Sequence, residues 1–263
     1  MRSNRQDGPP PGMSRREWRK KQASADAVAT PVPSEAPSPT STPPAPAAQG
    51  APLSGFLGGP APVAASSAAL TILTVCTGNI CRSPLAEVLL RTRLESLGVR
   101  VHSAGTHALV GHGMPEPALE LAAQAGAAAE ISSAHQARYL VEPLLVDADL
   151  VLAMAREHRS HVVKMMPNRL RRTFTVREFA RLASSVSTDE AKAVADAAGE
   201  SPKERFAAVL QTVIDQRGLS RASGDEDDVV DPYRRSRETY ARSAAELVPA
   251  LDEVERIVRA TIG

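Results

Sequence analysis

The stretch Leu73-Thr74-Val75-Cys76-Thr77-Gly78-Asn79-Ile80-Cys81-Arg82-Ser83-Pro84 decides the fold of this chain. The apolar run 70–75 predicts a buried strand, and Pro84 in a first turn, with apolar residues spaced along one face after it, predicts a helix. A short loop joins the two. A loop between a strand and a helix N-terminus gathers unpaired N–H groups and the positive end of the helix dipole. The stretch therefore predicts an anion site.

The side chains of this loop suit phosphate chemistry through a thiolate. Cys76 lies among loop amides, a helix N-terminus and an arginine, surroundings that favour the nucleophilic thiolate. The planar fork of Arg82 matches two phosphate oxygens. Gly78 lets the backbone approach an anion, and Asn79 tolerates the unusual dihedral angles of such a loop. We expect the hydroxyl of Ser83 to bond the sulfur.

Two other kinds of loop are excluded. Two cysteines with four residues between them and six scattered histidines do not make a usual structural zinc site, and we expect no metal or other cofactor. A nucleotide-binding glycine loop is excluded because no Gly-Lys-Ser/Thr ending is present.

Composition narrows the class of protein. The net charge of +1 gives no support for a nucleic-acid partner, and no run of 18 apolar residues indicates a transmembrane segment. The two cysteines lie in one loop and do not form a disulfide framework. A reduced, cytoplasmic protein is therefore expected.

The first 68 residues differ from the rest and hold thirteen of the 21 prolines. Residues 2–21 carry seven Lys/Arg, and residues 23–68 are rich in Ala, Pro, Ser and Thr. We interpret 1–68 as a disordered extension, basic and then Pro/Ala/Ser-rich. A basic arm that touches an acidic surface is the alternative for 2–21. Residues 69–263 are predicted to form one domain.

Strand and helix patterns alternate in that domain. Strands are expected at 70–75, 99–102, 149–154 and 173–176, and helices at 83–96, 117–126, 155–165, 177–183, 202–216 and 237–262. This order predicts a three-layer α/β fold, with about four parallel strands, helices on both faces, and the phosphate-binding loop after the first strand.

Four further expectations concern segments between these elements and the shape of the last helix. Residues 103–106 are small and predict a turn, and 184–228 look less regular than the rest. The acidic run 224–228 is interpreted as a solvated loop. The last helix is expected to be interrupted or kinked near Pro249.

The loop resembles the signature of the low-molecular-weight protein-tyrosine phosphatases of bacteria. The segments 103–106 (Ser-Ala-Gly-Thr), 134–138 (Ala-His-Gln-Ala-Arg) and 231–233 (Asp-Pro-Tyr) are similar to further patterns of that family, in the same order. The resemblance covers 70–183 and 229–262, and the segment 184–228 between them is expanded relative to the family.

The resemblance implies roles for individual residues. Cys76 would attack phosphorus and form a phosphocysteine, and Asp231 would protonate the leaving group and then activate water. Ser103 and His135 would support Asn79. The phosphate would be held by Thr77, Gly78, Asn79, Ile80, Cys81, Arg82 and Ser83. In the family the second loop cysteine can form a disulfide with the nucleophile, which would protect it from further oxidation.

The implied substrate is a phosphotyrosine protein, with a bacterial tyrosine kinase as one partner and a monomer favoured. Two alternatives stay open: a thiol-dependent arsenate reductase on the same fold, and a non-catalytic phosphate-binding module. The stretch 107–114, which would border the substrate, contains no Phe, Tyr or Trp. Arg234 and Arg235 after Tyr233 favour an acidic substrate.

Overall fold

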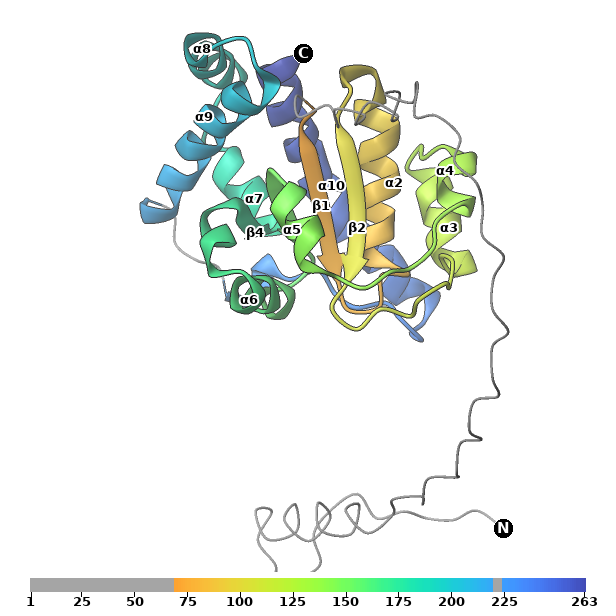
Figure 1. Ribbon diagram of the computed structural model, residues 1–263. Coiled ribbons are helices and arrows are strands. Elements are labelled where there is room, and N and C mark those ends of the chain that lie inside the picture. Colours follow the sequence, from red (N-terminus) through yellow and green to blue (C-terminus); the bar gives the residue numbers. More distant parts are fainter. Residues whose placement is uncertain (1–68, 220–223) are drawn as a thin grey trace, which may run out of the picture. The chain divides into compact units, whose positions relative to one another are not determined.

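Four parallel strands, in the order β2-β1-β3-β4, form the central sheet of the computed structural model, which describes residues 69–219 and 224–263 (Figure 1). The strands are β1 (Thr71–Cys76), β2 (Arg100–Gly105), β3 (Leu150–Ala153) and β4 (Thr173–Thr175). β1 is buried at every residue and pairs with β2 on one side and β3 on the other. The strand predicted ahead of the loop is thus central.

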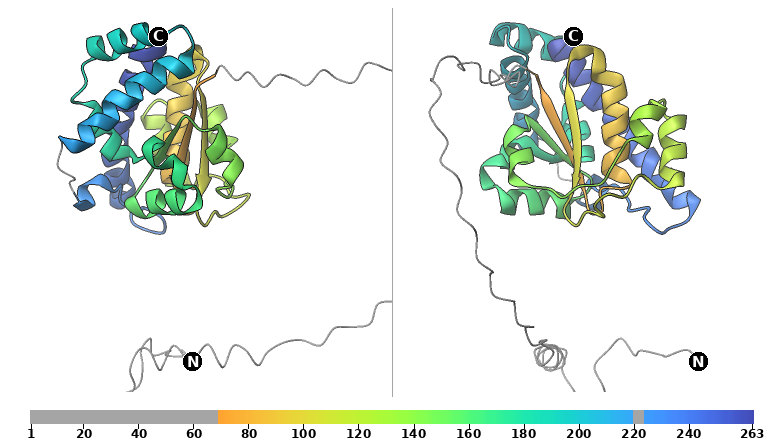
Figure 2. Two further views of the ribbon diagram at one scale, coloured as in Figure 1. Left: turned by 60° about the vertical axis from the view of Figure 1, so that its left-hand side comes forward. Right: turned by 45° about the vertical axis from the view of Figure 1, so that its right-hand side comes forward.

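Helices cover both faces of the sheet (Figures 1 and 2). Successive β1 side chains point to opposite faces: Ile72 packs into the larger core and Leu73 and Val75 into the smaller. The larger core also includes residues of α2 (Arg82–Leu94), α7 (Val176–Ala183) and α10 (Arg237–Ile262). The smaller includes residues of α5 (Glu142–Asp147) and α6 (Arg156–Met165). The predicted three-layer α/β fold is confirmed.

The remaining elements connect these layers. They are the helices α3 (Glu116–Gln124), α4 (Ala129–Ser133), α8 (Thr188–Ala198) and α9 (Pro202–Asp215), and the 3₁₀ turns Glu95–Leu97, Pro167–Arg172, Gln216–Gly218 and Gly224–Asp227. None of the helices within the described ranges is long and apolar enough to cross a membrane. The predicted extension 1–68 lies outside the described residues.

The structure corrects the expected turn at 103–106. Strand β2 continues through Ser103 and Ala104 to Gly105, which pairs with Cys76 at the end of β1. Small residues are poor strand formers by themselves, but here the neighbouring strand supplies the pairing. As a result, the end of β2 lies directly beside the loop that follows β1.

Two further expectations were wrong. The segment 184–228 is more regular than expected, because it contains α8 in addition to the predicted helix, which is α9. The last helix is not interrupted at Pro249: α10 is continuous from Arg237 to Ile262. Proline removes one backbone hydrogen bond, but Leu247 and Leu251 on either side are fully buried and hold the helix against the core.

The short connection from β4 to α7 offers a test of the fold. The hydroxyl of Thr175 accepts a hydrogen bond from the Glu178 N–H (3.1 Å), and the Glu178 carboxylate accepts one from the Thr175 N–H (3.2 Å), which together form a capping box. Thr175→Ala should lower the free energy of unfolding by about 1 kcal/mol in urea titrations. Thr212→Ala, inside α9, should change it by less than about 0.5 kcal/mol. Equal losses in both variants would contradict this cap.

Candidate active site

The loop after β1 surrounds the sulfur of Cys76 at the carboxyl end of the parallel strands, where ligands bind in open α/β sheets. The side chain is buried, and its Sγ accepts hydrogen bonds from the Asn79 N–H (3.3 Å) and the Ser83 hydroxyl (3.0 Å). Two donors aimed at one sulfur stabilise negative charge on it. The loop thus places two hydrogen-bond donors at this sulfur.

Asn79 holds the loop in shape. It is fully buried and has a φ of 54°, a left-handed conformation that few residues adopt. Its amide nitrogen donates to the hydroxyls of Ser83 (3.0 Å) and Ser103 (2.7 Å), and its amide oxygen accepts from the Arg138 N–H (2.9 Å). The His135 ring donates to its backbone carbonyl (2.8 Å). Ser103 and His135 therefore lie where the resemblance would place them.

A buried carboxylate that the sequence did not reveal lies behind these supports. Glu87 of α2 accepts a hydrogen bond from the Ser103 hydroxyl and lies 3.5 Å from Nδ1 of His135. Burial alone would raise the pKa of Glu87, but the hydrogen bonds from His135 and Ser103 hold it below its ordinary value. The available signal was an acidic residue between apolar positions of the predicted helix.

Arg82 and Asp231 meet at the mouth of the loop. The Arg82 side chain is 4% exposed; its Nη2 lies 2.8 Å from the carboxylate of Asp231, and its Nη1 donates to the Val229 carbonyl (3.0 Å). Its Nε is buried without a hydrogen-bond partner among the described residues. Asp231 is about half exposed. The structure brings the predicted nucleophile, arginine and carboxylate to one place.

These groups line a cavity of about 140 Å³. Its lining consists of Cys76, Thr77, Gly78, Ile80, Cys81, Arg82, His107, Leu109, Asp231 and Tyr233. Thus the stretch 107–114 does contribute a flat ring, that of His107, beside the aliphatic Leu109. Tyr233 adds a second ring. A small cavity with an anion-binding base and partly apolar walls suits a phosphate group attached to a ring.

The end of β2 shapes the loop from outside. The N–H groups of Thr106 and Leu109 donate to the carbonyls of Cys76 and Gly78, both at 2.9 Å. A Cβ at Gly105 would lie 2.5 Å from the carbonyl oxygen of Thr77, closer than real Cβ atoms come. The loop is therefore built against a position that admits no side chain.

Cys81, the second cysteine of the loop, has different surroundings from the first. It is buried, shares a 3.5 Å hydrogen bond with the Tyr240 hydroxyl, and has a pKa raised to about 11, chiefly by burial. Both cysteines are free in the structure. The protective disulfide implied by the resemblance stays a prediction.

His158 is a second residue that the sequence did not reveal. It extends from α6, is 2% exposed, and its Nε2 lies 2.8 Å from the Thr77 hydroxyl in a hydrogen bond. Burial, with the nearby charge of Arg82, lowers the pKa of His158 to about 3. A neutral ring therefore supports the loop residue next to the nucleophile.

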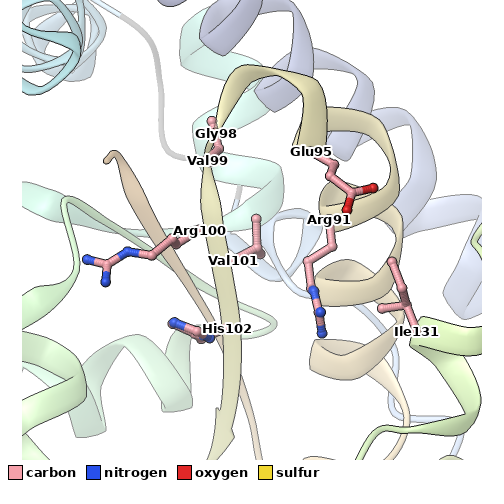
Figure 3. A pocket seen from close by; sticks show the side chains of 8 residues that line it. All are labelled: Arg91, Glu95, Gly98, Val99, Arg100, Val101, His102 and Ile131. Atoms are coloured by element: carbon pink, nitrogen blue, oxygen red, sulfur yellow. The ribbon is translucent and has the colours of Figure 1, made fainter. Parts of the chain in front are cut away.

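A second cavity, of about 370 Å³, lies along β2 (Figure 3). It borders Arg100, at the amino end of the strand, which pairs with Thr71 at the start of β1. Its arginines have carboxylate neighbours: Arg91 lies near Glu87, and Arg100 bonds Asp147. This second cavity thus lies toward the opposite end of the strands from Cys76. The charges of its arginines are largely balanced by carboxylates of the protein. The candidate active site is the cavity at the loop.

Comparison with known families supports this choice. The family model described as "Low molecular weight phosphotyrosine protein phosphatase" matches residues 71–218, which is more than half of the chain. The fold and loop thus define a cysteine-based phosphatase scaffold, and the chain belongs to the low-molecular-weight phosphotyrosine protein phosphatase family. The match ends before Asp231, so the place of this residue in the site rests on the structure.

Two bacterial relatives are similar to this chain in sequence over part of their length. The low-molecular-weight protein-tyrosine-phosphatase Etp of Escherichia coli K12 is 46% identical over 97 residues, which are 37% of this chain and 62% of Etp. The chain therefore spans less than two thirds of the length of that relative. The probable low-molecular-weight protein-tyrosine-phosphatase EpsP of Ralstonia solanacearum is 42% identical over 108 residues, 41% of this chain and 71% of EpsP.

Solved structures agree with the fold. A mutant of YwlE from Bacillus subtilis superposes with a TM-score of 0.50 at 24% identity and covers 73% of this chain and 99% of its own. A mutant of the YwlE arginine phosphatase that carries a phosphorylated active-site serine has a TM-score of 0.50 at 26% identity, covering 72% of this chain and 96% of its own.

The buried ring of His158 predicts a pH dependence of stability. In the unfolded chain its pKa is about 6.5, and in the folded protein about 3, so between these values the unfolded state binds more protons. The contribution to stability is complete above pH 6.5 and is lost as the pH falls toward 3. We therefore compare the folding equilibrium constants of wild type and His158→Gln by urea unfolding across this window. For each pH unit of acidification, the constant of wild type should fall by about tenfold relative to that of the variant.

The control is His112→Gln, at an exposed histidine of the 107–114 stretch. It should follow the wild-type pH profile. A His158→Gln variant that follows the same profile would show that the ring is accessible to protons in the folded protein.

Proposed function

We propose that this protein is a phosphatase that hydrolyses phosphotyrosine, an aryl phosphate monoester, through a phosphocysteine intermediate. The observation that most supports this function is the arrangement of groups around the sulfur of Cys76. Cys76 Sγ accepts two hydrogen bonds inside a cavity that Arg82 and Asp231 also line. A nucleophile, a cation and a carboxylate in one small cavity are the groups that such a reaction needs.

In the first step the Cys76 thiolate attacks phosphorus. A sulfur–phosphorus bond forms, the bond from phosphorus to the phenolic oxygen breaks, and the carboxylic acid of Asp231 gives its proton to the leaving oxygen. The guanidinium of Arg82 and the loop N–H groups hold the remaining phosphate oxygens. The Nε of Arg82, which bonds no described residue, supplies one donor for them.

In the second step water completes the reaction. The carboxylate of Asp231 takes a proton from water, the water oxygen bonds to phosphorus, and the sulfur–phosphorus bond breaks. The thiolate of Cys76 leaves with the hydroxyl of Ser83 (3.0 Å) bonded to it, and inorganic phosphate is released. The hydrogen bond thus stabilises the sulfur as a leaving group.

The cavity walls support a ring as the group that carries the phosphate. Leu109 and Tyr233 border the opening, and the Arg234 guanidinium lies 5.1 Å from the centroid of the Tyr233 ring. Arg234 and Arg235, which follow Tyr233 in the chain, suit acidic residues near the phosphotyrosine. The substrate class is thus a phosphotyrosine protein, since the relatives are named protein-tyrosine phosphatases. A bacterial tyrosine kinase is one such protein, which the family resemblance of the sequence implies. A cytoplasmic location follows from the need to keep Cys76 reduced.

The two alternatives rank lower. An arsenate reductase that couples to a protein thiol needs further redox cysteines, whereas the chain has two, both in this loop. A version that uses an external small thiol is tested below. A non-catalytic phosphate-binding module would not need Asp231 beside Arg82.

Turnover of p-nitrophenyl phosphate by the purified protein tests the main proposal. Cys76→Ser should reduce phosphate release to the level without protein, because the nucleophile is lost. Asp231→Ala should lower kcat/KM by about 10²-fold, because it removes the general acid. Asp252→Ala, at an exposed surface carboxylate, should match wild type.

The same preparation should be offered arsenate with a small thiol. No phosphate release from aryl phosphates, together with thiol-dependent formation of arsenite, would replace the phosphatase proposal by the reductase. Binding of phosphate without either reaction would favour the non-catalytic module.

We also propose that residues 69–263 form the catalytic domain, with the expanded segment 184–228 as part of it. Deletion of 1–68 should then leave kcat and KM on p-nitrophenyl phosphate unchanged, because the described residues that line the cavity all lie downstream. A large fall in kcat would show that the extension contributes to the site.

A further inference from the structure

Asp227 and Asp228, in the acidic run ahead of Asp231, are paired with arginines and are not part of a solvated loop as the sequence predicted. Asp227 is 7% exposed, and its carboxylate accepts hydrogen bonds from the Arg181 guanidinium at 3.1 and 3.4 Å. A carboxylate is buried in a folded protein when it is paired, because the unpaired charge is costly to desolvate. Asp227 is therefore part of the structure around the site.

Asp228 is held still more closely. Its carboxylate accepts from the Arg156 backbone N–H (2.8 Å) and from Nε and Nη2 of the same arginine (3.3 and 3.2 Å). Arg156 is the first residue of α6, so the carboxylate lies at the positive end of that helix. The Asp228 carbonyl accepts from the Arg177 guanidinium of α7 (3.0 Å). Both the side chain and the backbone of this residue are anchored.

The next residues are anchored through their backbone. The Val229 N–H donates to the carbonyl of Met154 (2.8 Å), directly after β3, and the Val229 carbonyl accepts from Arg82 (3.0 Å). The Val230 N–H donates to the Glu246 carboxylate of α10 (2.8 Å). Residues 227–231, which we call the clasp, thus bond to α2, α6, α7, α10 and the end of β3.

The clasp ends on the proposed proton donor. Asp231 is about half exposed, and among the described residues its carboxylate bonds Arg82 and the N–H of Tyr233 (3.2 Å). Neither contact fixes the distance from its carboxyl to the sulfur, because Tyr233 is on the same loop and Arg82 must also hold phosphate. The backbone that carries this carboxyl follows directly after the anchored residues 227–230.

We infer that Asp228, with Asp227, is a positioning residue that fixes the carboxyl of Asp231 for proton transfer to the leaving group. This inference rests on the proposed phosphatase function. It assigns the acidic run a role in the reaction without contact with the substrate. Since misplacing a catalytic group by about 1 Å can cost about 10²-fold in rate, a few ion pairs at the base of the clasp are sufficient for a large effect.

The test compares two substrates that differ in leaving group, with the full-length protein. Phenyl phosphate has a poor leaving group that needs a proton, whereas 2,4-dinitrophenyl phosphate has a good one that leaves without it. Asp228→Asn should lower kcat/KM on phenyl phosphate by about tenfold or more and on the dinitrophenyl ester by less than about threefold. Affinity for vanadate, which reports the loop and Arg82, should stay within about twofold of wild type.

Two further variants sharpen the test. Arg177→Met removes the bond to the Asp228 carbonyl and leaves both carboxylates in place, so it serves if Asp228→Asn folds poorly; the same selective loss is expected. Asp196→Asn is the matched control, because it breaks an Asp–Arg pair with Arg205 between α8 and α9, away from the cavity. It should match wild type on both substrates.

The outcomes separate the two proposals. If wild type hydrolyses neither ester, the phosphatase function fails and this inference with it. Suppose instead that wild type is active and Asp228→Asn loses activity equally on both esters, or that its affinity for vanadate falls by the same factor as its activity. The clasp then supports the fold or the position of Arg82, and not the proton donor. Unchanged activity in Asp228→Asn and Arg177→Met would also overturn the inference.

Discussion

The structure of the site depends on the backbone of one buried asparagine. Asn79 adopts a left-handed conformation, and this turn directs its N–H to the sulfur of Cys76. Each polar atom of its side chain has a partner, as does its backbone carbonyl. Such a conformation costs about 1–3 kcal/mol and persists only where the surroundings enforce it. The partners, from α2, the end of β2 and the segment 135–138, are those surroundings.

Two networks of charged groups reach the loop, one through Asn79 and the other through Arg82. In the first network Glu87 receives hydrogen bonds that continue through Ser103 to Asn79. In the second network the clasp joins α6 and α7 to Arg82 through the carbonyl of Val229. Both networks pair their buried charges, which is the condition under which such groups are tolerated in an interior. Rigid supports of this kind hold catalytic groups in place more reliably than loops alone.

The sequence predicted the local structure around Cys76 well and the long-range contacts poorly. The strand, loop and helix around Cys76 are contiguous, so their pattern could be read directly, and the alternation of elements gave the sheet. Glu87, His158 and the clasp could not be found in this way, because their partners lie far along the chain. The helix α8 was missed although Ser187 and Glu190 form the serine-to-glutamate spacing of a helix start, because its Ala-rich sequence shows little periodicity.

The ion pair between Arg82 and Asp231 has a consequence for which anions the cavity accepts. In the resting protein the guanidinium is already bonded to an anion of the protein itself (2.8 Å). A ligand that takes the same Nη2 donor must displace that carboxylate, and an anion with a single charge exchanges one such bond for a similar one. A phosphate dianion offers more charge and more oxygens to the same fork. For a ligand that uses this donor, the carboxylate of Asp231 is thus a competitor, whose bond to Arg82 the ligand must replace.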